Sequence, residues 1–292
     1  MSDRFVAEHP PPDVAGSPDR GRSWGGSAIV GATIIGVIVF TALVSFVWTP
    51  HDPLLVQGAA RLQGASSEFW FGTDRFGRDV FSRLMMGART ALFVGVVAVS
   101  LAGLVGTPLG ILMGMAPRWL SQLFLRTNDL LLAFPALLLA IMFGAVYGAS
   151  TFTAMIAIGI ATIPVFARVA RSGTLQVLSS EYVLAARSAG RSRPAIALRH
   201  VLPNIGGLVI VQASVSFAIA VLAEAALSFL GFGTQPPTPS WGRMLQEAQE
   251  LVAVAPMQAV WPGLAIAAAV LGFNLLGDGL RDRFDPRLDD SR

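Results

Sequence analysis

Residues 181–204 read EYVLAARSAGRSRPAIALRHVLPN, a charged and helix-forming segment between long apolar runs. In this segment and just before it, apolar side chains recur at helical spacing and predict one narrow stripe, at Leu175, Leu178, Tyr182 and Ala185. A helix with such a stripe needs an apolar partner. The pattern therefore predicts a docking element rather than a spacer between membrane helices.

Gly190 interrupts this pattern at a point where a left-handed turn costs least. Pro194 follows Ser192 and suits the first turn of a second helix, which Pro203 is expected to end. The sequence thus predicts two short helices joined at Gly190 and held at the membrane surface. Their basic outer face and small apolar ridge would fit a cleft on a soluble protein.

The segment resembles the cytoplasmic signature loop of binding-protein-dependent ABC permeases, at Tyr182, Ala185, Ala186, Arg187, Gly190, Arg199, His200, Leu202, Pro203 and Asn204. In that family the loop is the coupling helix that sits in a groove of the ATPase subunit. The general signature has a glutamate directly before the two alanines, where this chain has Leu184, and Glu181 lies one helical turn earlier. Peptide-type permeases share that shift, so the resemblance implies coupling roles for Glu181 and the matching residues. A basic loop that only obeys membrane topology is the alternative.

Composition agrees with a membrane protein. Hydrophobic residues make up 53% of the chain and charged residues 13%, and the charges are crowded into short intervals. Three runs lack any charged side chain and are long enough for the roughly 20 residues that cross a bilayer, namely 28–50, 90–117 and 251–277.

A fourth uncharged run, residues 130–167, is too long for one span. As a single helix it would measure about 57 Å at about 1.5 Å per residue, against a hydrocarbon thickness of about 30 Å. We therefore expect it to turn near Gly148 and to form spans over 130–147 and 151–169. Residues 205–232, interrupted only by Glu224, make a sixth span.

Six crossings place both termini on one side of the membrane, and the arginines indicate which side. Fifteen lie on the side of the termini and six on the other, five of these between the first two spans. The positive-inside rule then predicts cytoplasmic termini in a multi-pass protein of the inner or plasma membrane. The segment 181–204 faces the cytoplasm in this topology.

Several function classes are excluded by residues that the chain lacks. All 21 basic residues are arginine, so a phosphate-binding loop ending in Gly-Lys-Ser/Thr is absent. Cysteine is also absent, and His9, His51 and His200 are too scattered for a metal cluster. We expect no catalytic residue, no metal and no cofactor on this chain, with ATP and Mg²⁺ bound by partner subunits.

Residues 70–84 read WFGTDRFGRDVFSRL and carry apolar residues at helical spacing, Phe76, Val80, Phe81 and Leu84. They predict an amphipathic helix at the outer interface. The string resembles an element that precedes the core in peptide-type permeases. An interfacial brace and a substrate contact are the two interpretations, and Arg78 is expected to pair locally with Asp79.

Glu224 is the only carboxylate well inside a span, where its burial costs at least a few kcal/mol. One hypothesis places it on the translocation path, opposite the amine of a passing peptide. The other is a structural hydrogen bond.

Asn128 and Asp129 are expected to cap the cytoplasmic start of the third span. Glycines are expected to let helices approach closely, at Gly95, Gly103, Gly106 and Gly110.

Residues 231–245 contain three prolines and three glycines, which predict an ordered outer loop without a regular element. With residues 273–287 this loop resembles the C-type permease of dipeptide and oligopeptide importers, and the resemblance spans residues 28–288. It implies contacts with a substrate-binding protein at Gln235, Trp241 and Arg243. Loop packing, with Trp241 as an interfacial anchor, is the alternative.

The predicted fold is an all-α membrane protein with six transmembrane helices, a type I ABC importer permease fold with a cytoplasmic coupling helix. Its parts are a flexible cytoplasmic tail (1–24), the first helix with an outer interfacial segment (25–89), the core (90–280) with the coupling loop 171–204, and a cytoplasmic tail (281–292).

The resemblance implies four kinds of partner: a second homologous permease, two ATP-binding subunits, an extracytoplasmic peptide-binding protein and membrane lipids. It implies no nucleic acid. Peptides are the expected cargo, with nickel chelates, glutathione or another small solute as the alternative. A secondary transporter and a scaffold without transport remain as other classes.

Overall fold

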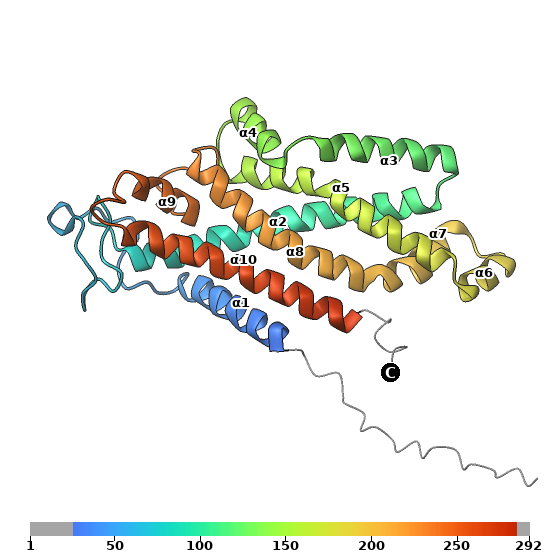
Figure 1. Ribbon diagram of the computed structural model, residues 1–292, viewed down its shortest axis with the longest axis horizontal. Coiled ribbons are helices and arrows are strands. Elements are labelled where there is room, and N and C mark those ends of the chain that lie inside the picture. Colours follow the sequence, from blue (N-terminus) through green and yellow to red (C-terminus); the bar gives the residue numbers. More distant parts are fainter. Residues whose placement is uncertain (1–25, 285–292) are drawn as a thin grey trace, which may run out of the picture.

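The computed structural model describes residues 26–284, whose regular elements are helices apart from one isolated β-bridge (Figure 1). The long helices are α1 (Gly26–Val44), α2 (Val80–Met115), α5 (Thr151–Leu178), α8 (Leu202–Phe229) and α10 (Met257–Phe284). The shorter helices are α3 (Arg118–Ala133), α4 (Ala136–Tyr147), α6 (Glu181–Ser188), α7 (Arg193–Ile196) and α9 (Trp241–Gln249), with a 3-10 turn at Gly58–Ala60 and a π turn at Ala197–Val201.

The long helices form one elongated bundle, in which α2 packs along α5, α8 along α10, and α1 along α10 (Figure 1). Glycines of α2 let this helix approach α5 closely. A Cβ on Gly106 would lie 2.6 Å from the Ile163 carbonyl oxygen, and one on Gly110 would lie 2.6 Å from the Ala170 Cβ. The predicted close approach at these glycines is confirmed, and it occurs within the subunit.

Among the described residues, five helices are long and apolar enough to cross a membrane, and the bent pair α3 and α4 makes a sixth if it forms one broken span. The two helices of this pair meet at 78°. Pro135 stands at their junction and cannot continue α3, because proline has no backbone N–H. The predicted span 130–147 is therefore not one continuous helix, because α3 ends at Ala133 and α4 begins at Ala136.

The capping role predicted for Asn128 and Asp129 is wrong, because α3 starts ten residues earlier, at Arg118. Both residues lie inside this helix and face α5. The Asn128 side chain donates a hydrogen bond of 3.1 Å to the Pro164 carbonyl, and Asp129 pairs with Arg168 at 2.7 Å.

The helix predicted from residue 70 is also wrong, since α2 starts at Val80 and the preceding residues form a tight loop. Gly72 and Gly77 have φ values of 76° and 77°, which a continuous helix does not permit. The Asp79 carboxylate caps α2 by accepting a hydrogen bond of 2.9 Å from the Ser82 N–H. Arg78 pairs with Asp74 instead of Asp79, at 2.6 Å.

The ends of several helices differ from the predicted spans. Helix α1 ends at Val44, and α5 continues to Leu178. Helix α10 continues to Phe284, so residues 281–284 are its last turn and not part of a tail. The predicted tail 1–24 and residues 285–292 lie outside the described part of the chain.

Candidate functional site

The segment between α5 and α8 projects from one end of the bundle, opposite the end that carries α9 (Figure 1). Helix α6 ends in a Schellman motif, in which the Arg191 N–H donates to the Ala186 carbonyl at 3.1 Å and the Gly190 N–H donates to the Arg187 carbonyl at 2.9 Å. Gly190 has a φ of 77°. The left-handed turn predicted at Gly190 is confirmed, and so is the short helix before it. The predicted second short helix is wrong, because α7 continues through the π turn into α8 and makes one helix over Arg193–Phe229.

Buried aliphatic side chains fix this loop to the bundle. Val183, Ile196 and Val201 are almost completely inaccessible and share one apolar cluster with Ile111 of α2 and Ala170 of α5. Because the anchors come from α6, α7 and the π turn, the whole loop is tied to the two helices beneath it. A displacement of the loop is therefore expected to move α2 and α5 as well.

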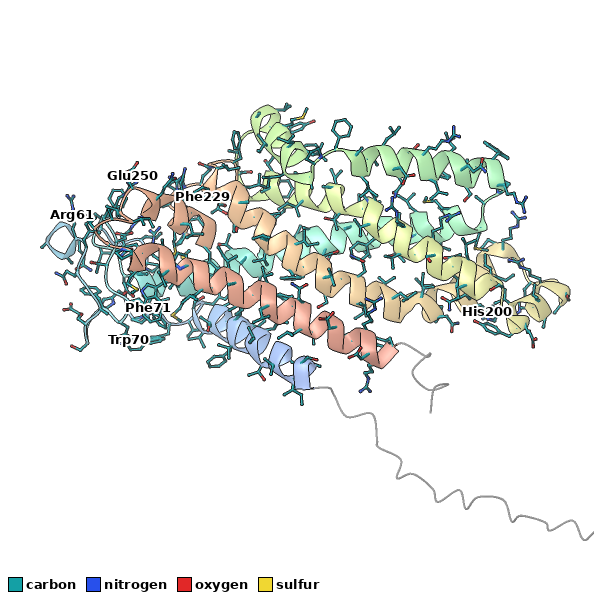
Figure 2. All side chains as sticks on the ribbon, viewed as in Figure 1. Arg61, Trp70, Phe71, His200, Phe229 and Glu250 are labelled. Carbon is teal, nitrogen blue, oxygen red and sulfur yellow. The ribbon has the colours of Figure 1, made fainter. Side chains whose placement is uncertain are left out.

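Other apolar side chains of the loop are exposed. Tyr182 is 48% exposed, and Leu198, which lines a groove beside α2 and α3, is 66% exposed. The ring of Tyr182 lies 6.0 Å from that of His200, which Figure 2 labels at this end. The other residues predicted to couple to an ATPase are also exposed or half-buried at this end, namely Glu181, Ala185, Ala186, Arg187, Gly190, Arg199, Leu202 and Pro203.

Two details of the predicted loop need correction. The apolar stripe is not continuous, because α5 ends at Leu178 and Tyr182 belongs to the separate helix α6, whose buried residue is Val183. Pro203 does not end the second helix, because it lies in the first turn of α8, directly after the π turn. Proline lacks the N–H that an α-helix uses, and the wider π turn relieves the clash with the preceding carbonyl.

Glu224 of α8 is 1% exposed and makes hydrogen bonds. Its Oε1 accepts from the Ser228 hydroxyl at 2.6 Å and from the Thr234 hydroxyl at 3.1 Å. The Thr234 N–H in turn donates to the Ser228 Oγ at 2.9 Å. These contacts tie the end of α8 to the following loop and support the structural interpretation of Glu224.

The opposite end of the bundle holds a buried charge cluster that joins the loop before α2 to α9. Glu247 accepts from Arg78 at 2.8 Å and from Arg83 at 2.9 Å, and the Arg83 side chain is 2% exposed. Local sequence patterns did not reveal this cluster, because Glu247 lies more than 160 residues from both of its arginine partners.

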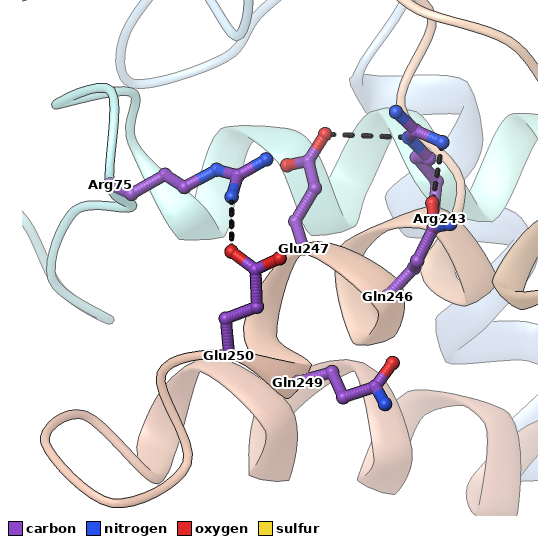
Figure 3. A pocket seen from close by; sticks show the side chains of 6 residues that line it. All are labelled: Arg75, Arg243, Gln246, Glu247, Gln249 and Glu250. Atoms are coloured by element: carbon purple, nitrogen blue, oxygen red, sulfur yellow. Dashed lines mark hydrogen bonds and ion pairs between the residues drawn. The ribbon is translucent and has the colours of Figure 1, made fainter.

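Beside this cluster opens a polar pocket of about 410 Å³ (Figure 3). On its walls, Arg75 pairs with Glu250 at 3.1 Å and Arg243 with Glu247 at 3.6 Å. Figure 2 places Arg61, Trp70, Phe71 and Glu250 at the same end of the molecule. The pocket therefore offers charges of both signs at the surface.

The three predicted binding-protein contacts differ in exposure. Trp241 is 4% exposed and donates to the Leu84 carbonyl at 3.0 Å, so it is a core residue and cannot serve as a contact. The Gln235 side chain donates to the Gly231 carbonyl within its own loop at 2.8 Å. Arg243 lines the polar pocket. The prediction of no regular element is wrong from Trp241 onward, where Ser240 caps α9 by accepting from the Arg243 N–H.

Known proteins resemble this chain over most of its length. Residues 106–290 match the family described as binding-protein-dependent transport system inner membrane component. The chain is 43% identical over 261 residues to the dipeptide transport system permease protein DppC of Alkalihalophilus pseudofirmus, covering 89% of this chain and 86% of that protein. It is 43% identical over 262 residues to the glutathione transport system permease protein GsiD of Pectobacterium atrosepticum, covering 88% and 87%.

A solved structure of the MetNI methionine ABC transporter in an inward-facing conformation has a similar fold. The TM-score is 0.57 with 15% sequence identity, and the match covers 69% of this chain and 96% of that one. At this identity the likeness concerns the fold alone.

Proposed function

The chain belongs to the family of binding-protein-dependent transport system inner membrane components and is a permease subunit of an ABC importer, and from this premise we propose that it carries dipeptides or oligopeptides across the membrane. A second homologous permease forms the other half of the path. Similarity to a dipeptide permease supports the peptide cargo. The alternative cargo is glutathione, which the second relative supports, or another small solute such as a nickel chelate.

In this proposal two partner subunits hydrolyse ATP, and their motion enters the chain through α6, Gly190 and α7. The anchored loop is the observation that carries the proposal. Val183 and Ile196 hold it to the bundle, while Tyr182 stays exposed. A groove of an ATPase subunit is expected to cover this exposed side chain.

The proposed topology places both termini and this loop in the cytoplasm, supported by the excess of arginine on that side. The end with α9 then faces outward. There an extracytoplasmic binding protein docks near the polar pocket, and Arg243 and Gln235 remain as candidate contacts. Glu224 is too deeply hydrogen-bonded to be assigned to the path in this conformation.

Copurification tests the proposal most simply. Purification of the chain with its genomic neighbours is expected to yield two ATPase subunits and a second permease. Mass spectrometry of the ligand on the associated binding protein then identifies the cargo. A permease that transports alone, without nucleotide, would contradict the coupling scheme, whereas a glutathione or metal-chelate ligand would replace only the cargo.

A further inference from the structure

A basic cavity of about 370 Å³ lies between the coupling loop and the ends of α2 and α5. Arg187, Arg191 and Arg193 line it, together with Gly114 and Met115 of α2. The described residues that line the cavity include no carboxylate. None of the three guanidinium groups makes an ion pair or hydrogen bond to another residue of the range 26–284. Three uncompensated positive charges therefore converge on one space.

An apolar groove of about 1180 Å³ begins beside this cavity and shares Met115 and Arg193 with it. The groove is lined by α2, α3, α7 and α8, with exposed leucines among its walls, including Leu104, Leu112 and Leu198. Along α2 it extends from Val99 to Met115, about 24 Å at about 1.5 Å per residue. This is about four fifths of a hydrocarbon thickness of about 30 Å, so the groove is deep enough to hold an acyl chain.

We propose that this composite site binds a phospholipid with an anionic headgroup. Its phosphate lies among Arg187, Arg191 and Arg193, and an acyl chain lies in the groove. Arginine suits this role because its planar guanidinium donates two parallel hydrogen bonds to phosphate oxygens. Basic pockets beside spanning helices on the cytoplasmic side recognise such headgroups.

The groove distinguishes a lipid from an acidic side chain of an ATPase subunit. A carboxylate of a soluble protein would neutralise the arginines but leave the adjoining apolar walls uncovered. A lipid fills both spaces at once. A lipid bound there also touches both α2 and the coupling loop, so it is placed to stiffen the connection between them.

Native mass spectrometry of the assembled transporter, without cargo or nucleotide, tests this site. The probes are phosphatidylglycerol and phosphatidylcholine with the same oleoyl chains. The double variant R191Q/R193Q is expected to lower the preference for phosphatidylglycerol at least about tenfold, or about 1.4 kcal/mol. The matched control R118Q/R126Q removes two other arginines, neither of which lines the cavity or the groove, and is expected to retain the preference.

Three results would overturn the proposal. An equal loss in both double variants would indicate general surface charge. Displacement of phosphatidylglycerol by an equal concentration of inorganic phosphate would indicate an ion site without a lipid. A preference for phosphatidylglycerol in the permease pair alone that is absent from the assembled transporter would assign the arginines to the ATPase subunits. The readout is lipid binding alone. The lipid site can therefore be confirmed or refuted independently of the cargo proposed above.

Discussion

Substitution of Gly190 is expected to uncouple ATP hydrolysis from transport without unfolding the protein. Its φ of 77° is the left-handed conformation, which costs other L-residues about 1–2 kcal/mol. A Cβ at this position would meet no atom within 4 Å, so the backbone alone carries the penalty. A penalty of that size lowers the equilibrium ratio of the native to the non-native turn by a factor of about 5–30.

The order of side chains follows from this backbone argument. Gly190→Asn is expected to be nearly neutral, because asparagine tolerates the left-handed region. Gly190→Ala is expected to reduce the coupling of ATP hydrolysis to transport by an intermediate amount. Gly190→Val is expected to reduce it most, since a branched side chain is the least tolerated in the left-handed region.

The assay compares uptake into proteoliposomes with ATP hydrolysis by the assembled transporter. For Gly190→Val, cargo imported per ATP hydrolysed is expected to fall about fivefold or more, with membrane insertion intact. The matched control is Gly206→Val in α8, where a Cβ also meets no atom within 4 Å but no positive φ is required. Normal coupling in Gly190→Val, or equal loss in the control, would refute the reasoning.

Three further substitutions test the packing. Gly106→Leu is expected to separate α2 from α5 and lower the thermal stability of the purified transporter, because its Cβ would lie 2.6 Å from the Ile163 oxygen. Glu224→Leu is expected to lower the free energy of unfolding by about 1–3 kcal/mol for each hydroxyl left unpaired. Glu224→Gln keeps an acceptor and should retain stability. Lost uptake in a stable Glu224→Gln variant would return this residue to the translocation path. Glu247→Ala is expected to lower the free energy of unfolding by about 3 kcal/mol, because it removes the carboxylate 2.9 Å from the buried Arg83 guanidinium and leaves Arg83 only Asp74, at 3.6 Å. Glu250→Ala, at a side chain 78% exposed, should lower it by about 0–1 kcal/mol. Equal melting temperatures of these two variants would contradict a structural role for the cluster.

The sequence predicted best what depends on local patterns. Uncharged runs predicted the spanning helices because a bilayer core excludes charge. Gly190 predicted a left-handed turn because few other residues adopt one. The short helix before it followed from the same local signals.

Predictions failed where distant contacts or backbone geometry decided the structure. The apolar spacing in residues 70–84 imitated a helix, but Gly72 and Gly77 adopt positive φ and break it. Tryptophan is a residue type typical of interfacial anchors, yet Trp241 packs against Gly87, more than 150 residues earlier in the chain. The Arg83–Glu247 pair depends on a fold that brings α9 to the start of α2, which no local window contains.

Site-specific labelling tests the central claim most directly, because this chain has no cysteine of its own. A single cysteine at the exposed residue Ala189 is expected to react with a membrane-impermeant maleimide only from the cytoplasmic side, and to be protected when the ATPase subunits assemble. A cysteine at the exposed residue Glu68 should react only from outside, with or without those subunits. Labelling of Ala189→Cys from the exterior, or no protection by the ATPase subunits, would contradict the account.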